Sequence, residues 1–344
     1  MTAVKFDNVS IVFGSSPERA LAMADQGKTR DEIGAATGLV LGVANASLEI
    51  EEGEILVLMG LSGSGKSTLL RAVNALAPVV RGDVQVYDKG RALNPYKCSA
   101  EELRQLRMNT VSMVFQQFAL LPWRTVAENV GFGLELAGVP EAERKKRVGE
   151  QLELVNLSKW ADRKVQELSG GMQQRVGLAR AFATGAPILL MDEPFSALDP
   201  LIRTRLQDEL LEFQRRLKKT ILFVSHDLDE AFRIGNRIAI MEGGRIVQCG
   251  TPQDIVRNPA DQYVADFVQN MNPINMLTAS DVMRPGTDNS VSVSGTATPD
   301  TSLVTILDVM ARQPGVVGVV DNGAVIGVIT AQDIVAGLTR HRRV

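Results

Sequence analysis

The segment 60–68, GLSGSGKST, combines glycines, hydroxyls and a lysine in an arrangement that can bind phosphate groups. Its glycines allow consecutive backbone N–H groups to turn toward one anion, and the helix expected from Ser67 directs the positive end of its dipole at the same anion. Lys66 adds a charge for the outer phosphates, and the Ser67 hydroxyl is placed to coordinate Mg²⁺. We therefore predict a nucleotide site made by Gly60, Ser62, Gly63, Ser64, Gly65, Lys66, Ser67 and Thr68.

The flanks of this segment distinguish a phosphate site from a glycine-rich loop that binds nothing. An apolar run, 55–59 (ILVLM), comes directly before it, and a helical pattern follows. Strand, loop, Lys-Ser and helix in this order form the context in which the P-loop pattern is informative. We interpret the segment as a P-loop.

Two carboxylates follow a second apolar run, at 188–193 (ILLMDE). Asp192 is predicted to hold Mg²⁺ through water, and Glu193 to polarise an attacking water molecule. An apolar run that ends in Asp-Glu is weak evidence by itself, because strands often end in charged residues at a surface turn. The Asp-Glu run becomes stronger evidence for a nucleotide site because the same chain also contains a P-loop.

A second helix start with the same chemistry lies at 168–175, LSGGMQQR. A serine hydroxyl and two glycine amides at the start of a helix can bind an anion, although a simple helix cap with a glycine turn is the alternative. Two phosphate-binding helix starts in one chain make sense if the second completes the site of another copy. The residues predicted for it are Ser169, Gly170, Gly171 and Gln173.

The elements that position these residues alternate between short apolar runs and longer helical patterns, which predicts an α/β domain with a largely parallel sheet. We expect strands at 55–59, 111–115, 188–191 and 221–225, helices from Ser67 and near 141–156, 171–184 and 201–218, and a hairpin at 237–250. Before the sheet, the stretch 15–38 predicts two short helices, which begin at Ser16-Pro17 and at Thr29 with a Glu32 capping box and end at Gly27 and Gly38.

In this order, the motifs resemble those of the ABC ATPase family over roughly residues 1–270, with a helical subdomain at about 118–172. The resemblance implies that Gln116 is the Q-loop glutamine, which contacts Mg²⁺ with Ser67 and Asp192 and couples to the membrane domains. It also implies a D-loop at 196–199 (SALD), with Asp199 near the nucleotide, and a switch histidine at His226. ATP and Mg²⁺ are the implied cofactors, Glu193, His226 and Gln116 the catalytic residues, and a second copy the partner that closes the site.

The stretch 15–38, the variant MGLSGSGKST and the run FALLPWRTVAENVGFGLEL resemble ATPase subunits of glycine betaine, choline and proline importers. This resemblance implies transport of glycine betaine, choline or proline betaine, permease subunits that dock at 117–132, and a substrate-binding protein as an indirect partner. The expected location is the cytoplasmic face of the plasma membrane. The adenine-stacking aromatic residue of the family is displaced by the insertion, and Phe13 is either that residue or part of the core.

The segment 278–344 resembles a small α+β CBS module, after a boundary near 275. We expect one helix at 302–313, strands at 316–320 and 324–329, and pairing with the module of the second subunit. Related modules regulate osmolyte import. The basic run 340–343 (RHRR) is either a contact for anionic lipid or a solvated tail.

The composition of the chain excludes several classes of partner and site. Net charge is −3, without the basic excess that phosphate-backbone contacts require, so nucleic acid is not expected. Two distant cysteines, Cys98 and Cys249, form no metal-ligand spacing, and no apolar run is long enough to cross a membrane. Rival interpretations are another small-solute importer, a soluble ABC ATPase or a non-catalytic regulator, and the Glu193 and His226 pair argues against the last.

Overall fold

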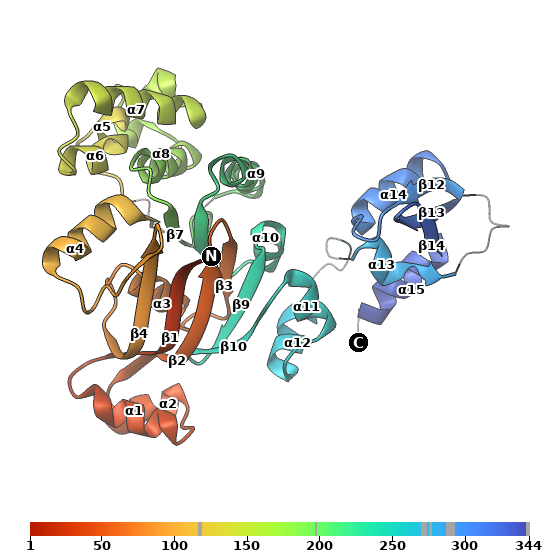
Figure 1. The fold of residues 1–344 in the computed structure, drawn as a ribbon, viewed down its shortest axis with the longest axis horizontal. Helices are drawn as coiled ribbons and strands as arrows, with labels where there is room; N and C mark the ends of the chain where they lie inside the picture. Colours follow the sequence, from red (N-terminus) through yellow and green to blue (C-terminus); the bar gives the residue numbers. More distant parts are fainter. Residues whose placement is uncertain (116–118, 197, 270–273, 275–276, 287–292, 342–344) are drawn as a thin grey trace. The chain divides into compact units, whose positions relative to one another are not determined.

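The computed structural model describes the chain except residues 116–118, 197, 270–273, 275–276, 287–292 and 342–344 (Figure 1). Met1–Cys249 and Gly250–Val344 form two compact units. The division lies before the boundary near 275 that the sequence favours. The predicted domain limits 1–270 and 278–344 therefore stay predictions, and each unit is described by itself.

A six-stranded sheet forms the centre of the first unit, in the order β10-β9-β3-β8-β7-β6. The pairs β3·β8, β3·β9, β7·β8 and β6·β7 are parallel, and β3, β7 and β8 are buried along their whole length, as expected for parallel strands covered on both faces. The predicted α/β fold is confirmed. The strands are β3 (Ile55–Met59), β6 (Val111–Val114), β7 (Ile188–Asp192), β8 (Thr220–Val224), β9 (Arg237–Glu242) and β10 (Arg245–Gly250).

A second sheet, with the order β2-β1-β4-β5 and antiparallel pairing, was not predicted. Its strands are β1 (Thr2–Phe13), β2 (Val40–Glu51), β4 (Val79–Asp88) and β5 (Arg91–Leu93). Register shifts interrupt β1 and break the strict alternation by which a strand is recognised in a sequence. The stretch 15–38 precedes the strands of the central sheet, as expected, and it lies between the paired strands β1 and β2 of the second sheet.

The inserted stretch forms the two predicted helices, α1 (Pro17–Asp25) and α2 (Arg30–Thr37). Thr29 and Glu32 make the predicted capping box, and Gly38 ends α2 with a left-handed backbone, φ 69°. Buried side chains of both helices pack against the β1–β2 hairpin in a small core of their own. Arg81 of β4 also holds Asp25 with two bonds, of 2.7 and 2.8 Å, so the insertion is fastened to the sheet.

The remaining helices of the first unit fall into two groups. Helices α5 (Val126–Val130), α6 (Phe132–Leu136) and α7 (Glu141–Leu154) pack with α8 (Gly170–Ala183) as a separate helical group in Figure 1. Helix α3 (Lys66–Ala72) contributes Leu69 and Leu70 to the core that both sheets share. The others are α4 (Ala100–Gln105), α9 (Pro200–Leu217), α10 (Leu228–Ile234), a π-helical turn (Leu106–Thr110) and 3-10 turns (Ser158–Trp160, Val165–Glu167).

The second unit contains a four-stranded sheet, β11-β14-β13-β12, with a core of its own. The predicted helix and both strands are present, but the expectation of one helix is wrong, because short α13 and terminal α15 also contribute buried side chains to that core. Arg257 of α11 forms an ion pair with Asp281 of α13, which links α11 to this unit. The elements are α11 (Pro252–Arg257), α12 (Gln262–Gln269), α13 (Ala279–Val282), β11 (Arg284–Pro285), β12 (Val293–Ala297), α14 (Leu303–Arg312), β13 (Val316–Asp321), β14 (Ala324–Ile329) and α15 (Ala331–His341).

Two sequence features fall outside this description. Gln116 lies among the undescribed residues, and the basic run 340–343 lies outside the side chains that the structure describes. Within the described part, no helix has both the length and the apolar character needed to span a bilayer.

Candidate functional site

The P-loop, Asp192, Glu193 and His226 lie at one edge of the central sheet. Strands β3, β7 and β8 run parallel, so their carboxyl ends lie side by side. The P-loop follows β3, Asp192 ends β7, and His226 comes two residues after the end of β8. Ligands of open α/β sheets bind at this edge.

Close backbone contacts fix the shape of the P-loop. Gly60 has φ 141°, and a Cβ atom added there would lie 2.1 Å from the carbonyl oxygen of Met241. Gly65 has φ 101°, and its Cβ would lie 2.3 Å from the carbonyl oxygen of Gly42. The N–H of Gly244, in the β9–β10 turn, donates to the Ser64 carbonyl over 3.1 Å. Only glycine fits the first two positions.

Lys66 is the buried cation of this loop, with 5% of its surface exposed. Its ammonium group donates to the carbonyl oxygens of Gly60 and Leu61, each over 2.9 Å. Burial lowers the pKa of Lys66, against the opposing effect of the Glu193 and Asp192 charges. The buried Ser64 hydroxyl has no hydrogen-bond partner in the described part of the chain. A buried ammonium and an unused hydroxyl suit an oxygen-rich anion such as a nucleotide phosphate.

Ser67 and Asp192 form the predicted metal-binding pair. The Ser67 hydroxyl donates to Oδ1 of Asp192 over 2.6 Å, and Asp192 is 1% exposed. Arg71, one turn after Ser67 on α3, donates to Oδ2 of Asp192 over 2.8 Å. Groups of three or more histidine, cysteine or acidic side chains suited to a metal are absent from the described residues. One hydroxyl and one carboxylate are a donor set suited to Mg²⁺, which usually takes its other ligands from water and substrate phosphate.

Glu193 has a left-handed backbone, φ 46°, which is rare for a non-glycine residue. Its N–H donates to the carbonyl oxygen of Val224 over 3.1 Å. Its own carbonyl accepts from the backbone N–H and the hydroxyl of Ser196, over 3.4 and 3.0 Å. The surrounding structure thus imposes a strained backbone on the predicted catalytic carboxylate.

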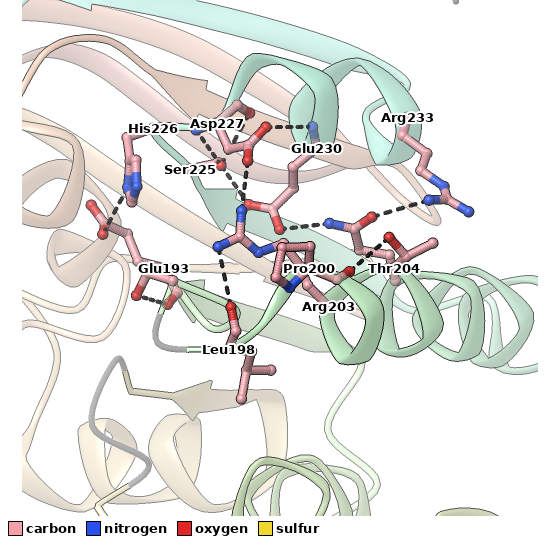
Figure 2. Close-up of polar contacts among 12 residues, drawn as sticks. Glu193, Leu198, Pro200, Arg203, Thr204, Ser225, His226, Asp227, Glu230 and Arg233 are labelled. Carbon is pink, nitrogen blue, oxygen red and sulfur yellow. Dashed lines mark hydrogen bonds and ion pairs between the residues drawn. The ribbon is translucent and has the colours of Figure 1, made fainter. Parts of the chain in front are cut away.

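His226 faces this carboxylate, as Figure 2 shows. Its Nδ1 atom lies 3.0 Å from Oε2 of Glu193. The histidine side chain is 55% exposed and that of Glu193 is 20% exposed, so the pair borders solvent while its carboxylate is largely covered. The two strand ends thus bring together the residues predicted to act on water.

The predicted residues at the start of α8 form their described hydrogen bonds within the segment 165–173. The Ser169 hydroxyl accepts from the Met172 N–H over 3.4 Å, and the Gln173 side chain donates to the carbonyls of Val165 and Leu168, each over 3.1 Å. A Cβ on Gly171 would lie 2.8 Å from Ile202 of α9, whereas none of the atoms around Gly170 is that close. Between described residues, no hydrogen bond joins 169–171 to the P-loop.

The structure also describes two further predicted site residues, Asp199 and Phe13. Asp199 caps α9, with its side chain accepting from the Ile202 N–H over 3.1 Å. Phe13 is 40% exposed, so it is not a core residue. A Cβ on Gly42 would lie 3.0 Å from both the Phe13 ring and the Thr68 methyl group, which places the ring beside the end of the P-loop.

Residues that the sequence did not single out also enter the site. Arg71 follows Ser67 by one helical turn, and the i, i+4 spacing could have identified it. Arg30 of the inserted helix α2 donates to the Gly63 carbonyl of the P-loop. No local signal predicts that contact, because it depends on how the insertion packs on the hairpin.

Residues 43–196 match the family described as ABC transporter, and residues 279–340 match the CBS domain family. The chain is similar to the glycine betaine/proline betaine transport system ATP-binding protein ProV of Escherichia coli, with 50% identity over 82% of this chain and 70% of that protein. It is similar to the trimethylamine N-oxide transport system ATP-binding protein TmoW of Ruegeria pomeroyi, with 43% identity over 94% of each chain. Among solved structures, the dimeric post-hydrolysis state of the ATP-binding cassette MJ0796 with ADP and phosphate matches 72% of this chain and 98% of that one, with 31% identity and TM-score 0.60.

The fold and the site together define an ATP-binding cassette ATPase with a C-terminal CBS domain. The chain belongs to the ABC transporter family, as an ATP-hydrolysing subunit of the group that contains the two relatives just described.

Proposed function

We propose that this chain energises the import of a quaternary amine osmolyte, with glycine betaine, choline and proline betaine as the candidates. The observation that carries the proposal is the 50% identity to a glycine betaine/proline betaine transport protein over 284 residues. The relative that covers 94% of this chain serves trimethylamine N-oxide, another small molecule with a fully substituted nitrogen. A methylated, fully substituted nitrogen is thus the chemistry shared by the transported molecules in these names.

In this proposal Lys66 and the loop amides bind the phosphates of ATP, and Ser67 with Asp192 would hold Mg²⁺, which supplies charge stabilisation at the reacting phosphate. Glu193 accepts a hydrogen bond from the attacking water and orients it. His226, 3.0 Å from Glu193, keeps that carboxylate in place and reaches toward the terminal phosphate. The left-handed backbone of Glu193 supports this role, since strained residues gather at functional sites. Gln116, assigned here from its motif alone, contributes to the metal and water positions.

A second copy completes the site in this proposal. Ser169, Gly170, Gly171 and Gln173 of one subunit bind the phosphates held by the P-loop of the other, with Asp199 at the same interface. The position of Ser169 as an N-cap of a fourteen-residue helix supports it, because the first N–H groups of that helix are oriented for an anion. The dimeric state of the MJ0796 cassette supports the same arrangement.

The permease partner is proposed to dock on the helical group. A hollow of about 850 Å³ lies between the segment 123–135 and helix α7. Trp123 lies at this hollow with 68% of its surface exposed, and charges of both signs line it. An exposed aromatic residue beside a hollow suits an inserted helix of a partner. We place the chain at the cytoplasmic face of the plasma membrane, where a permease would hold it, with a substrate-binding protein as an indirect partner.

Transport assays test this function. The chain, its permease and its binding protein would be reconstituted in vesicles, and the uptake of labelled glycine betaine, choline, proline betaine and trimethylamine N-oxide would be measured with Mg-ATP. We expect uptake of at least one of the first three, and its loss with Glu193→Gln, which keeps the size of the side chain and removes its charge. An ATP-stabilised dimer of that variant is the expected state of the isolated subunit.

A second candidate function is import of another small solute. A spermidine/putrescine import ATP-binding protein of Roseobacter denitrificans is 46% identical, but over only 66% of this chain. The same vesicles would therefore receive labelled spermidine. Uptake of spermidine without any methylated amine would replace the proposed substrate class.

The CBS module is proposed to regulate transport. It is a compact unit with its own core, which fits a separable regulatory role. Deletion of 278–344 should leave ATP hydrolysis in place and change the dependence of uptake on salt concentration. Unchanged salt dependence in vesicles would contradict regulation by this module.

A further inference from the structure

Polar contacts join helices α9 and α10 next to His226, in the cluster drawn in Figure 2. Helix α9 follows Asp199, and α10 begins two residues after His226. Arg203, in the first turn of α9, donates to Oδ2 of Asp227 over 2.7 Å, and both side chains are about three-quarters covered. The residue directly after the switch histidine is therefore held by the helix that follows the D-loop.

Both chain neighbours of His226 are fixed by this cluster. The Asp227 N–H donates to the Ser225 hydroxyl over 3.0 Å, and Asp227 Oδ1 caps α10 by accepting from the Glu230 N–H over 3.1 Å. The Ser225 hydroxyl donates to Glu230, whose other carboxylate oxygen accepts from the Gln207 amide of α9 over 3.0 Å. Burial raises the pKa of Glu230, which is 6% exposed. The backbone on each side of His226 thus has little freedom to move without α9.

Further contacts connect Arg203 to Glu193 through residues of the D-loop. Arg203 donates through its backbone N–H to the Asp199 carbonyl over 2.9 Å, and its side chain lies 3.4 Å from the Leu198 carbonyl. Ser196, at the start of that loop, bonds the Glu193 carbonyl. Glu193 itself meets His226. The contacts therefore close a ring from the catalytic carboxylate through the D-loop and α9 to the switch histidine.

We propose that Arg203 and Asp227 are positioning residues for ATP hydrolysis, which hold His226 in register with Glu193 and tie it to Leu198 and Asp199 of the same subunit. This inference rests on the proposed roles of Glu193 and His226. In the described part of the chain, neither the Arg203 nor the Asp227 side chain bonds the Glu193 carboxylate or the His226 ring. A displacement of the D-loop and the start of α9 moves His226 through this ion pair, so hydrolysis depends on where the D-loop lies.

The test compares two ion pairs between the same helices. Asp227→Asn removes the charge that Arg203 binds but keeps an oxygen to cap α10, since asparagine caps as well as aspartate. Asp208→Asn breaks the 2.7 Å pair with Arg233, which joins α9 to α10 between one and two helical turns farther from His226. Arg203→Gln removes the other partner of the first pair. Melting temperatures of all variants would establish that they are folded.

We expect Asp227→Asn and Arg203→Gln each to lower kcat for Mg-ATP about ten-fold, because small misplacement of a catalytic group is costly, with little change in KM. Asp208→Asn should stay within about two-fold of the wild type, as exposed ion pairs contribute little. The double variant Arg203→Gln/Asp227→Asn should be no slower than either single variant, since both break one interaction. Equal kcat for Asp227→Asn and Asp208→Asn would overturn the proposal, as would additive losses in the double variant.

A second readout separates positioning from a general loss of stability. The chain has two histidines, so NMR can follow the ring signals of His226 after assignment with His341→Ala. Asp227→Asn should shift the His226 signal and Asp208→Asn should not. If the His226 signal is unchanged in both Asp227→Asn and Asp208→Asn, the Arg203–Asp227 ion pair does not position His226. If His226→Ala hydrolyses ATP like the wild type, the proposed role of His226 is wrong, while the NMR shifts still decide whether Asp227 positions the ring.

Discussion

The two helix starts that we propose to bind phosphate, at the P-loop and at 168–171, have similar residues and different support from the rest of the chain. The P-loop is held from three sides: by Met241 and Gly244 at the β9–β10 turn, by Gly42 of β2, and by Arg30 of the insertion. At the other start Ser169 caps its own helix, and a Cβ on Gly171 would approach Ile202, whereas a Cβ on Gly170 would meet no described atom within 4 Å. The P-loop is therefore a site that one chain shapes by itself.

In the proposed dimer, each chain carries two half-sites that serve two different nucleotides, and the two half-sites have different structural requirements. A loop that must wrap around phosphate needs a fixed backbone, and the neighbouring strands supply it. A helix start that closes over phosphate from another subunit needs only its free N–H groups and an exposed approach. Similar residues at the two starts thus lead to different expectations for substitution.

The largest contrast is expected between Gly60→Ala and Gly170→Ala. A Cβ at Gly60 would lie 2.1 Å from the Met241 carbonyl on a left-handed backbone, while none of the neighbours of Gly170 lies within 4 Å of its Cβ. Left-handed strain and overpacking each cost about 1–3 kcal/mol, so Gly60→Ala should weaken ATP binding about 100-fold or more. Gly170→Ala should leave ATP binding by the single subunit unchanged in a fluorescence titration. Equal loss in both variants would mean that the second start also shapes the site of its own chain.

A mixed dimer sharpens the comparison with a smaller effect. Lys66→Ala disables the P-loop and Ser169→Ala the second helix start, and each variant alone should lose most of its turnover. When equal amounts of the two are mixed, half of the dimers pair one variant with the other, and each has one intact site. We expect recovery to about a quarter of wild-type turnover if the sites act independently, because closed two-fold pairing places each half-site against its mate. Full activity of Ser169→Ala alone would contradict a site shared between subunits.

The central sheet and the phosphate site could be predicted from the sequence, because both depend on local signals. Strands β3, β7 and β8 are unbroken apolar runs, and the Gly-Lys-Ser pattern lies directly after the first of them. The same holds for the capping box of α2 in the insertion. Each of these signals lies within a few residues of the feature that it predicts.

The antiparallel sheet and the support of the site could not be predicted in this way. Strand β1 alternates irregularly because its register shifts, and all of its pairing partners in β2 and β4 lie at least 27 residues away. Arg203 and Asp227 form no pattern in the sequence, and only the packing of α9 on α10 brings them together. Contacts between distant segments are therefore what the structure adds, and they are the contacts that hold the catalytic residues in place.

The smallest predicted effect concerns the base rather than the phosphates. Phe13 lies beside the end of the P-loop and is 40% exposed, so we propose that it stacks on adenine. Phe13→Ala should raise KM for ATP about five-fold or more with little change in kcat, because stacking contributes about 1–3 kcal/mol per base. Phe13→Trp should keep the affinity.

Trp160 offers a matched control for this substitution. It is an aromatic residue with 39% exposure that lies after α7 in the helical group, away from the P-loop. Trp160→Ala should leave KM unchanged in the same assay. If Phe13→Ala and Trp160→Ala give the same KM as the wild type, Phe13 does not bind the base, and the support of the P-loop by β1 and β2 serves the phosphates alone.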